Sequence, residues 1–166
     1  MTTSFDHLLA AYQPRILRTA LGFLGDEQEA REVAQEALLK AIAARDRYDP
    51  SRPFYPWLYR IARNTCLDAR ARRRHRAVPG LESERVVSPQ PSALDQVDQH
   101  EAIDRVRAAM EHLSEEHREI IVLRHFQDLS YSEIADLLGV AKGTVMSRLY
   151  RARRALARLL SEEDPA

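Results

Sequence analysis

The chain has 166 residues, which is enough for one ordinary domain or for two small ones. Its 25 basic and 25 acidic residues cancel, so the overall charge gives no indication of a nucleic-acid partner. Only 5 Gly stand among abundant Ala, Leu, Arg and Glu, a composition that favours helices over sheet, and we therefore expect an all-α protein.

Charge is nevertheless sorted along the sequence. Residues 1–76 carry 14 Lys and Arg against 9 Asp and Glu, residues 77–112 carry 3 against 7, and residues 113–166 carry 8 against 9. The N-terminal part is therefore basic and the middle acidic. Residues 142–158 hold six basic side chains and no acidic one, a distribution that makes a local basic face suited to phosphate binding.

The first helix is predicted over residues 5–24, where apolar side chains recur at spacings of three and four. Pro14 should kink or split it. A glycine ends this unit, and Asp26, with Glu29 three positions later, is predicted to cap a second helix that runs to about Ala44. The second helix has an apolar side, which includes Ile42. Its other side is polar and includes Glu32, Gln35 and Glu36.

A turn-rich loop follows, and Pro56 is well placed as the first residue of a third helix that runs to about residue 76. Projecting this helix places Leu58 and Ile61 on its inner stripe, with Trp57 beside them. Another side carries Tyr59, Arg60, Arg63 and Asn64. Such a side is suited to stacking on bases and bonding to their edges or to phosphates. The run "RARRRHR" then adds a dense positive end, although arginine runs also end helices as plain solvated surface.

Residues 77–95 interrupt the helical pattern with three Pro, one Gly and three Ser. This composition is typical of a flexible linker. We therefore predict two small helical domains, residues 1–76 and 96–166, joined by this segment.

The C-terminal domain contains a predicted helix-turn-helix. Ser130 and Glu133 form a predicted capping box, Gly139 is predicted to end the short helix, and a last helix is predicted from about Ala141 to Leu160. The second helix of this motif lies in the major groove of DNA. Its apolar residues face the core at spacings of three and four. The residues left to face outward are Lys142, Thr144, Met146, Ser147, Arg148 and Arg151. The alternative is a helical hairpin with a solvated cationic face.

Three stretches together resemble the extracytoplasmic-function sigma factors, a class of small bacterial RNA polymerase initiation subunits. They are "GDEQEAREVAQEALLKA", "FYPWLYRIARNTCLD" and "LSYSEIADLLGVAKGTVMSRLYRARRAL". The resemblance implies that the N-terminal domain binds the clamp of core RNA polymerase and opens the promoter at its −10 element, where it holds the single-stranded non-template strand. It also implies that the C-terminal domain reads the duplex −35 element.

Residue roles follow from the same resemblance. The surface that meets the polymerase matches Glu32, Gln35 and Glu36. The part that holds an extruded −10 base matches Lys40, Tyr48 and the loop to Phe54, while Arg60 and Asn64 match contacts at its upstream edge, on the side shared with Tyr59 and Arg63. The duplex-reading helix matches Lys142, Thr144, Ser147, Arg148 and Arg151. Departures are Glu32 for the usual Asp, Ala141 for a capping residue and Met146 for Lys or Arg.

Other expectations concern partners and chemistry. The resemblance implies an anti-sigma factor as a further partner, and we expect a monomer when free. The six His show no metal-binding spacing and no phosphate-binding Gly loop occurs, so we expect no metal, no cofactor and no enzyme activity. The lone Cys66 and the N-terminal sequence, which is unlike a signal peptide, predict a cytoplasmic protein without membrane insertion.

Three rival functions remain open at this point. A free-standing helix-turn-helix regulator would account for the C-terminal motif but leaves residues 26–76 unexplained. An enzyme such as a nuclease would need a carboxylate cluster that the sequence does not reveal. A degenerate sigma-like partner module would retain its function after Arg60 and Asn64 are replaced by Ala.

Overall fold

Helices make up both halves of the molecule. The computed structural model describes residues 4–77 and 94–162, and every regular element in those ranges is helical. The first range holds α1 (Phe5–Leu24), α2 (Glu27–Ala43), the 3₁₀ turn η1 (Arg45–Arg47) and α3 (Phe54–Arg76). The second holds α4 (Leu94–Glu111), α5 (Glu115–Ile121), the π-helical segment η2 (Val122–Phe126), α6 (Tyr131–Leu138) and α7 (Lys142–Glu162). The all-α prediction is confirmed.

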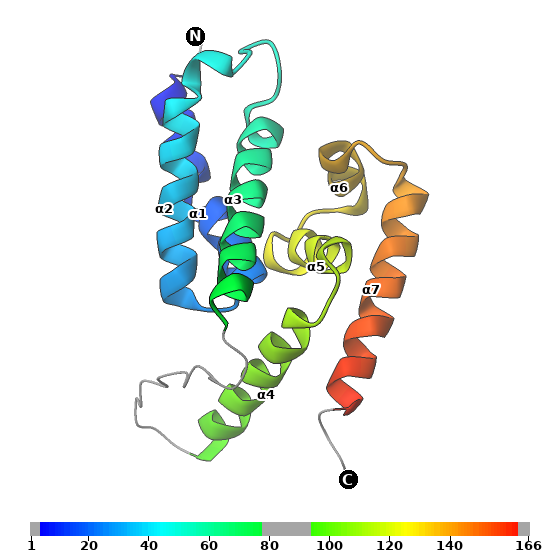
Figure 1. The fold of residues 1–166 in the computed structure, drawn as a ribbon. Coiled ribbons are helices and arrows are strands. Elements are labelled where there is room, and N and C mark those ends of the chain that lie inside the picture. The colour runs from blue at the N-terminus through cyan, green and yellow to red at the C-terminus, as the bar shows by residue number, and fades with distance from the viewer. Residues whose placement is uncertain (1–3, 78–93, 163–166) are drawn as a thin grey trace.

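Helices α1, α2 and α3 pack around an apolar core that includes Ile16, Phe23 and Leu58, each almost fully buried. Asp26 caps α2 as expected, because its Oδ1 accepts a hydrogen bond from the Glu29 amide at 2.7 Å. Of the two outcomes expected at Pro14, a kink or a split, the split does not occur, since α1 continues through it. The three helices therefore hold α2 and α3 side by side with one long face of each turned outward (Figure 1).

An aromatic cluster closes the end of this unit where the loop between α2 and α3 lies. Phe54 is 5% exposed, and its ring meets the Tyr48 ring edge-on with centroids 5.1 Å apart. Phe5 and Trp57 complete the contacts around Phe54 at 5.5 Å each. Edge-on packing of this kind favours a fixed arrangement of the rings. The loop is therefore anchored at one end by the half-buried Tyr48 and at the other by the buried Phe54.

The helix-turn-helix consists of α6 and α7. Both hydrogen bonds of the predicted capping box are present: the Ser130 hydroxyl accepts from the Glu133 amide, and the Glu133 carboxylate accepts from the Ser130 amide. Gly139 ends α6 with a φ of 65°, a left-handed conformation that a glycine adopts without strain. Val145, Leu149 and Ala152 are buried along α7, so its opposite face is turned outward.

The two halves lie in direct contact, with α1 packed against η2 and α5 (Figure 1). A Cβ placed on Gly22 would stand 2.7 Å from a methyl of Val122, so the close approach of α1 and η2 leaves room only for glycine. The buried apolar residues of both halves form one continuous core. Most of the predicted linker, residues 78–93, lies outside the described residues.

Candidate nucleic-acid and polymerase-binding surfaces

The outward face of α7 is the most open of the predicted surfaces. Lys142, Ser147 and Arg151 are exposed on it, opposite the buried stripe that ties α7 to the domain. An Arg or Lys on such a helix can donate to phosphates or to guanine, and a Ser can donate to phosphates. The geometry therefore matches a helix that can enter a duplex groove.

Two other predicted residues of α7 are partly covered. Thr144 is half-buried at the start of the helix. Arg148 is also half-buried, and its Nε lies 2.9 Å from the Glu116 carboxylate on α5. Arg148 is therefore already paired within its own domain, whereas Lys142 and Arg151 keep their charged groups at the surface.

The loop between α2 and α3 holds the residues predicted to receive an extruded base. Tyr48 is half-buried, and its hydroxyl donates to the Arg52 carbonyl oxygen at 2.9 Å. Lys40 is exposed at the end of α2 and pairs with Glu36 at 2.8 Å. Phe54, in contrast, is buried in the aromatic cluster, so its ring supports the loop and does not present a free stacking face.

The structure corrects the expected outward side of α3. Arg60 and Asn64 are exposed as predicted, but Tyr59 is only 3% exposed and faces the C-terminal domain. Its hydroxyl donates to the Glu119 carboxylate at 2.8 Å, and the Arg63 guanidinium contacts the same oxygen at 2.5 Å. The prediction that Tyr59 and Arg63 face outward is therefore wrong for this arrangement, because α5 covers that part of α3.

Electrostatics keeps the Tyr59 hydroxyl in its donating form. Burial, reinforced by the adjacent Glu119 carboxylate, raises the pKa of Tyr59 well above its usual value. The phenol therefore stays protonated at any physiological pH and keeps its hydrogen bond to α5.

The arginine run at the end of α3 is largely occupied. Arg70 is buried and its guanidinium reaches the Glu111 carboxylate at 2.9 Å and the Phe23 carbonyl oxygen at 3.0 Å. Arg73 reaches Glu111 as well, at 3.1 Å. In this arrangement the run makes specific contacts with other elements and is not a plain solvated helix end.

The polar face of α2 is open where polymerase contact was predicted. Glu32 and Gln35 are exposed, whereas Glu36 is half-buried between Lys40 and Arg72, with the Arg72 guanidinium at 3.2 Å. The hydrogen bond from Lys40, together with the nearby charge of Arg72, lowers the pKa of the Glu36 carboxyl. Glu36 is thus ionised and engaged, and Glu32 and Gln35 remain open.

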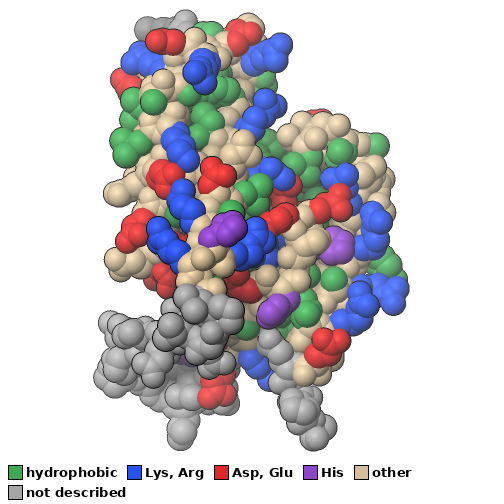
Figure 2. All heavy atoms as spheres, viewed as in Figure 1, with side chains coloured by type: hydrophobic (Ala, Val, Ile, Leu, Met, Phe, Trp, Pro, Cys, Tyr) green, Lys and Arg blue, Asp and Glu red, His purple; other side chains and the backbone are tan. Residues whose placement is uncertain are grey.

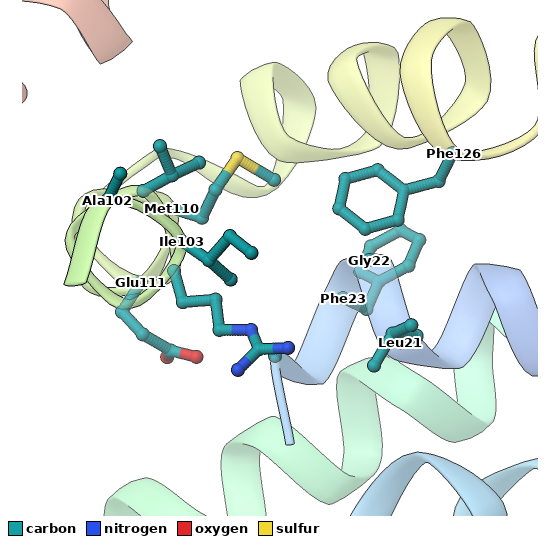
Figure 3. Close-up of a pocket in the computed structure, with 11 residues that line it drawn as sticks. Leu21, Gly22, Phe23, Ala102, Ile103, Met110, Glu111 and Phe126 are labelled. Carbon is teal, nitrogen blue, oxygen red and sulfur yellow. The ribbon is translucent and has the colours of Figure 1, made fainter. Parts of the chain in front are cut away.

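A cavity of about 380 Å³ lies between α1 and α4 (Figure 3). Its lining is mostly apolar and includes Leu21, Ile103 and Phe126, with Glu111 and Arg107 as charged members. A catalytic pocket needs several convergent polar groups. The lining of this cavity does not supply such a set.

Among residues 4–77 and 94–162, no cluster of three His, Cys, Asp or Glu could hold a metal ion. No helix in these same ranges is long and apolar enough to cross a membrane. Cys66 is buried in α3, and burial raises the pKa of its thiol to about 12, which leaves it unreactive.

Comparison with known proteins decides the family. Residues 8–76 match the family "Sigma-70 region 2", and residues 103–156 match "Sigma-70, region 4". The chain is 38% identical to the RNA polymerase sigma-H factor of Pseudomonas aeruginosa, covering 95% of this chain and 86% of the relative. It is 39% identical to the ECF RNA polymerase sigma factor SigL of Mycobacterium tuberculosis, covering 87% of this chain and 82% of the relative.

The chain belongs to the extracytoplasmic-function RNA polymerase sigma factors. A solved structure agrees with this: the sigma factor RpoE in complex with the anti-sigma factor NepR from Bartonella quintana. It matches with a TM-score of 0.64 at 28% identity, over 95% of this chain and 96% of that chain. The resemblance seen in the three sequence motifs is confirmed. Sigma factors act in transcription initiation and are not enzymes, so the family also confirms that this chain is not one.

Sequence reasoning missed two apolar features of the sigma factor's surface. Ile42 was expected in the core of the N-terminal domain but is 51% exposed, and Leu39 is 66% exposed beside it on α2. Both lie at helical spacing from Gln35, on the same face. On α7, Tyr150 is 62% exposed four positions after Met146. A wider helical projection of each element could have found these residues, because apolar side chains continued onto the polar face.

Proposed function

We propose that this sigma factor reads the −35 element through α7 and the −10 element through the α2–α3 loop and α3, while α2 binds core RNA polymerase. The observation that carries the proposal is the outward face of α7, where Lys142, Ser147 and Arg151 are exposed above a buried apolar stripe. A basic face of this kind fits the major groove, with Arg148 and Thr144 at its edge.

In the N-terminal domain, the proposed −10 contacts are Lys40, Tyr48, Arg60 and Asn64, all exposed or half-buried. Extrusion of a base costs a few kcal/mol of unstacking and unpairing, which an aromatic-walled loop can offset. Phe54 contributes by fixing the position of Tyr48, since their rings pack edge-on. Tyr59 and Arg63 take part only after α5 has moved away from them.

Core polymerase is proposed to bind the α2 face that carries Glu32, Gln35, Leu39 and Ile42. Exposed apolar side chains flanked by polar ones are typical of a protein-binding surface. Glu36 serves this face indirectly, because it pairs with Lys40 and Arg72 and so ties α2 to α3.

Two further features follow from the role in initiation. We propose that the protein acts together with RNA polymerase in the cytoplasm. The RpoE neighbour is bound to the anti-sigma factor NepR. We propose that an anti-sigma factor likewise restrains this chain.

In vitro transcription tests the proposal. The purified chain should bind core RNA polymerase and direct specific initiation from promoter fragments of its own genome. If it fails to bind the polymerase but shifts duplex DNA by itself, the second reading, a free-standing helix-turn-helix regulator, replaces this one. Arg60→Ala with Asn64→Ala should depress promoter opening more than polymerase binding.

The α2 surface has its own test. Leu39→Ala with Ile42→Ala should weaken binding to core polymerase, measured with labelled sigma factor, because it removes the exposed apolar contacts. Met146→Ala is a matched control, since Met146 is 52% exposed but lies on α7. Equal polymerase affinity for the α2 variant and the control would contradict the assignment.

A further inference from the structure

One row of side chains on α7 carries apolar groups where the rest of the outward face is basic. Lys142, Met146, Tyr150 and Arg154 follow one another at intervals of four residues, so they lie along the same side of the helix. Met146 is 52% exposed and Tyr150 is 62% exposed. Figure 2 shows Lys and Arg side chains gathered along α7, with hydrophobic side chains between them. The apolar pair is therefore flanked by a cation at each end of the row.

The core of the domain uses the opposite side of α7, where Val145 and Leu149 are almost fully buried. Met146 and Tyr150 are therefore not needed to hold the helix in place. The Arg154 guanidinium lies over the Tyr150 ring, 5.7 Å from its centroid, and this contact restrains the ring. An exposed apolar pair on a ligand-binding face indicates contact with an apolar group of the ligand.

Gly143 leaves a hollow next to this pair. It precedes Met146 by three residues and Ser147 by four, so these two side chains are its neighbours on the helix surface. Apart from its chain neighbours and the backbone of its own helix, a Cβ placed on Gly143 would meet no atom of the described chain within 4 Å, so the packing of those residues does not require a glycine there. A glycine in a helix costs stability relative to alanine. Its use at this position is explained if another molecule approaches the backbone closely.

Duplex DNA offers one apolar group of this kind in its major groove. Every base edge there shows hydrogen-bond donors or acceptors, and only thymine adds a methyl group, on C5. A methionine side chain is flexible and polarizable, so it can pack around such a methyl. It does not satisfy the N4 amino group of a cytosine in the same place, and a donor left unpaired costs affinity. A base covered by Met146 is therefore favoured as thymine over cytosine.

We propose that Met146 is a specificity-determining residue: together with Tyr150 and the hollow at Gly143, it receives the C5 methyl of one thymine in the −35 element. This role rests on the proposed function of α7 as the duplex-reading helix. The basic side chains of α7 hold DNA of any sequence through its phosphates, whereas the methyl contact depends on one base. Loss of a single buried methyl should weaken binding about fourfold.

The first experiment removes only the methyl. The chain is bound to core polymerase and tested on a promoter fragment on which it initiates, with each thymine of the −35 element, on either strand, replaced in turn by deoxyuridine. Deoxyuridine pairs with adenine through the same groups and lacks the C5 methyl. Competition between the two duplexes measures the ratio of their affinities. We expect one position to lose about fourfold, by the same factor at low and at high salt, because the contact involves no charge.

Variants assign that position to Met146. Met146→Ser should bind the thymine and deoxyuridine duplexes about equally, whereas Met146→Leu, of similar volume, should keep most of the preference. Ile103→Ser is the matched control: Ile103 is 49% exposed but lies on α4, and this variant should keep the full preference. Substitutions at such exposed sites change stability little, so all three variants should fold.

Two results would overturn the proposal. One is a wild-type chain that binds every deoxyuridine duplex as tightly as its thymine parent. The other is a preference that Met146→Ser leaves unchanged, because the methyl would then contact another residue. A wild-type chain that initiates on no promoter fragment would instead contradict the proposed function.

Gly143→Ala tests the hollow independently. Because a Cβ has room there, alanine should raise or preserve the urea midpoint of unfolding. The same Cβ occupies the hollow, so affinity for the promoter duplex should fall, and the preference for thymine over deoxyuridine should fall with it to below about twofold. An alanine variant with wild-type affinity and wild-type preference would show that no base approaches Gly143 and would overturn the methyl contact.

Discussion

The basic end of α3 and the outward face of α7 both carry several arginines in the sequence. In the structure the arginines of α3 are largely paired with carboxylates, whereas most of those of α7 are exposed. On α3, Arg70 is buried and contacts a carboxylate from another domain at 2.9 Å. On α7, Arg151 is exposed, and its Nε donates to a carbonyl oxygen of its own helix, that of Ser147, at 3.4 Å. The difference lies in whether another element brings carboxylates to the arginines, not in the arginines themselves.

This contrast separates two uses of arginine in one chain. A buried guanidinium with carboxylate and carbonyl partners holds the fold and the docked domains, and its removal leaves those partners unpaired. An exposed guanidinium contributes little to stability and stays available to a ligand. Substitution of a buried arginine should therefore change the stability of the fold, and substitution of an exposed arginine should change ligand binding. The effects should be largest for the buried group and smallest at the surface.

The largest effect is expected at Arg118, which is 1% exposed. Its guanidinium donates to the carbonyl oxygens of Met110 and Leu113, at 2.8 and 2.9 Å, and to Glu115 at 2.7 Å. Arg118→Ala leaves these buried acceptors unpaired, so the free energy of unfolding should fall by about 3–5 kcal/mol. Urea unfolding followed by circular dichroism measures the loss.

Arg158 supplies the comparison for Arg118, because it is exposed on α7. Arg158→Ala should change the free energy of unfolding by no more than about 0.5 kcal/mol. If both variants lost the same stability, the distinction between covered and open arginines would fail.

The sequence alone predicts the outward face of α7 better than it predicts the covered side of α3. The helix-turn-helix depends on local signals: the capping box at Ser130, the glycine at 139 and the apolar spacing on α7. Local signals survive folding because the residues that interact are neighbours in the sequence. The predicted outward residues Lys142 and Arg151 are exposed for that reason.

The side of α3 that carries Tyr59 could not be placed in the same way. Its partner Glu119 is 60 residues further along the chain. A helical projection divides a helix into an inner and an outer side, but α3 is covered on one side by its own domain and on another by α5. One signal did point to this contact: residues 1–76 are basic and residues 77–112, which include Glu111, are acidic.

The next largest effect is expected at Arg151, on the exposed face of α7. Arg151→Ala should leave the free energy of unfolding within about 0.5 kcal/mol of wild type. It should weaken duplex binding similarly on all sequences and reduce the slope of log affinity against log salt by about 1, because a phosphate contact is lost. Fluorescence anisotropy at several salt concentrations measures both. An unchanged slope and affinity would show that this part of α7 does not meet DNA.

A smaller effect is expected at Ser130, which caps α6 ahead of α7. Its hydroxyl accepts from the Glu133 amide at 3.2 Å. Ser130→Ala should lower the free energy of unfolding by about 1 kcal/mol, while Ser130→Asp, which keeps an acceptor, should retain most of it. Chemical unfolding of the two variants side by side tests this, and equal losses would mean that the cap contributes through something other than its hydrogen bond.

The smallest effect is a pH dependence at Glu133. Hydrogen bonds from the Ser130 amide, at 2.7 Å, and from its side chain lower the pKa of the Glu133 carboxyl below its ordinary value of 4.5. In the unfolded chain this carboxyl takes up its proton first, so its contribution to stability is present above pH 4.5 and is lost as the pH falls through the lower folded value. Glu133→Gln still accepts from the Ser130 amide but does not titrate. Its unfolding free energy should therefore fall less steeply than that of wild type on acidification, whereas Glu101→Gln, an exposed carboxylate outside any cap, should follow the wild-type curve. Parallel curves for wild type and Glu133→Gln would mean that the capping box does not depend on the carboxylate charge.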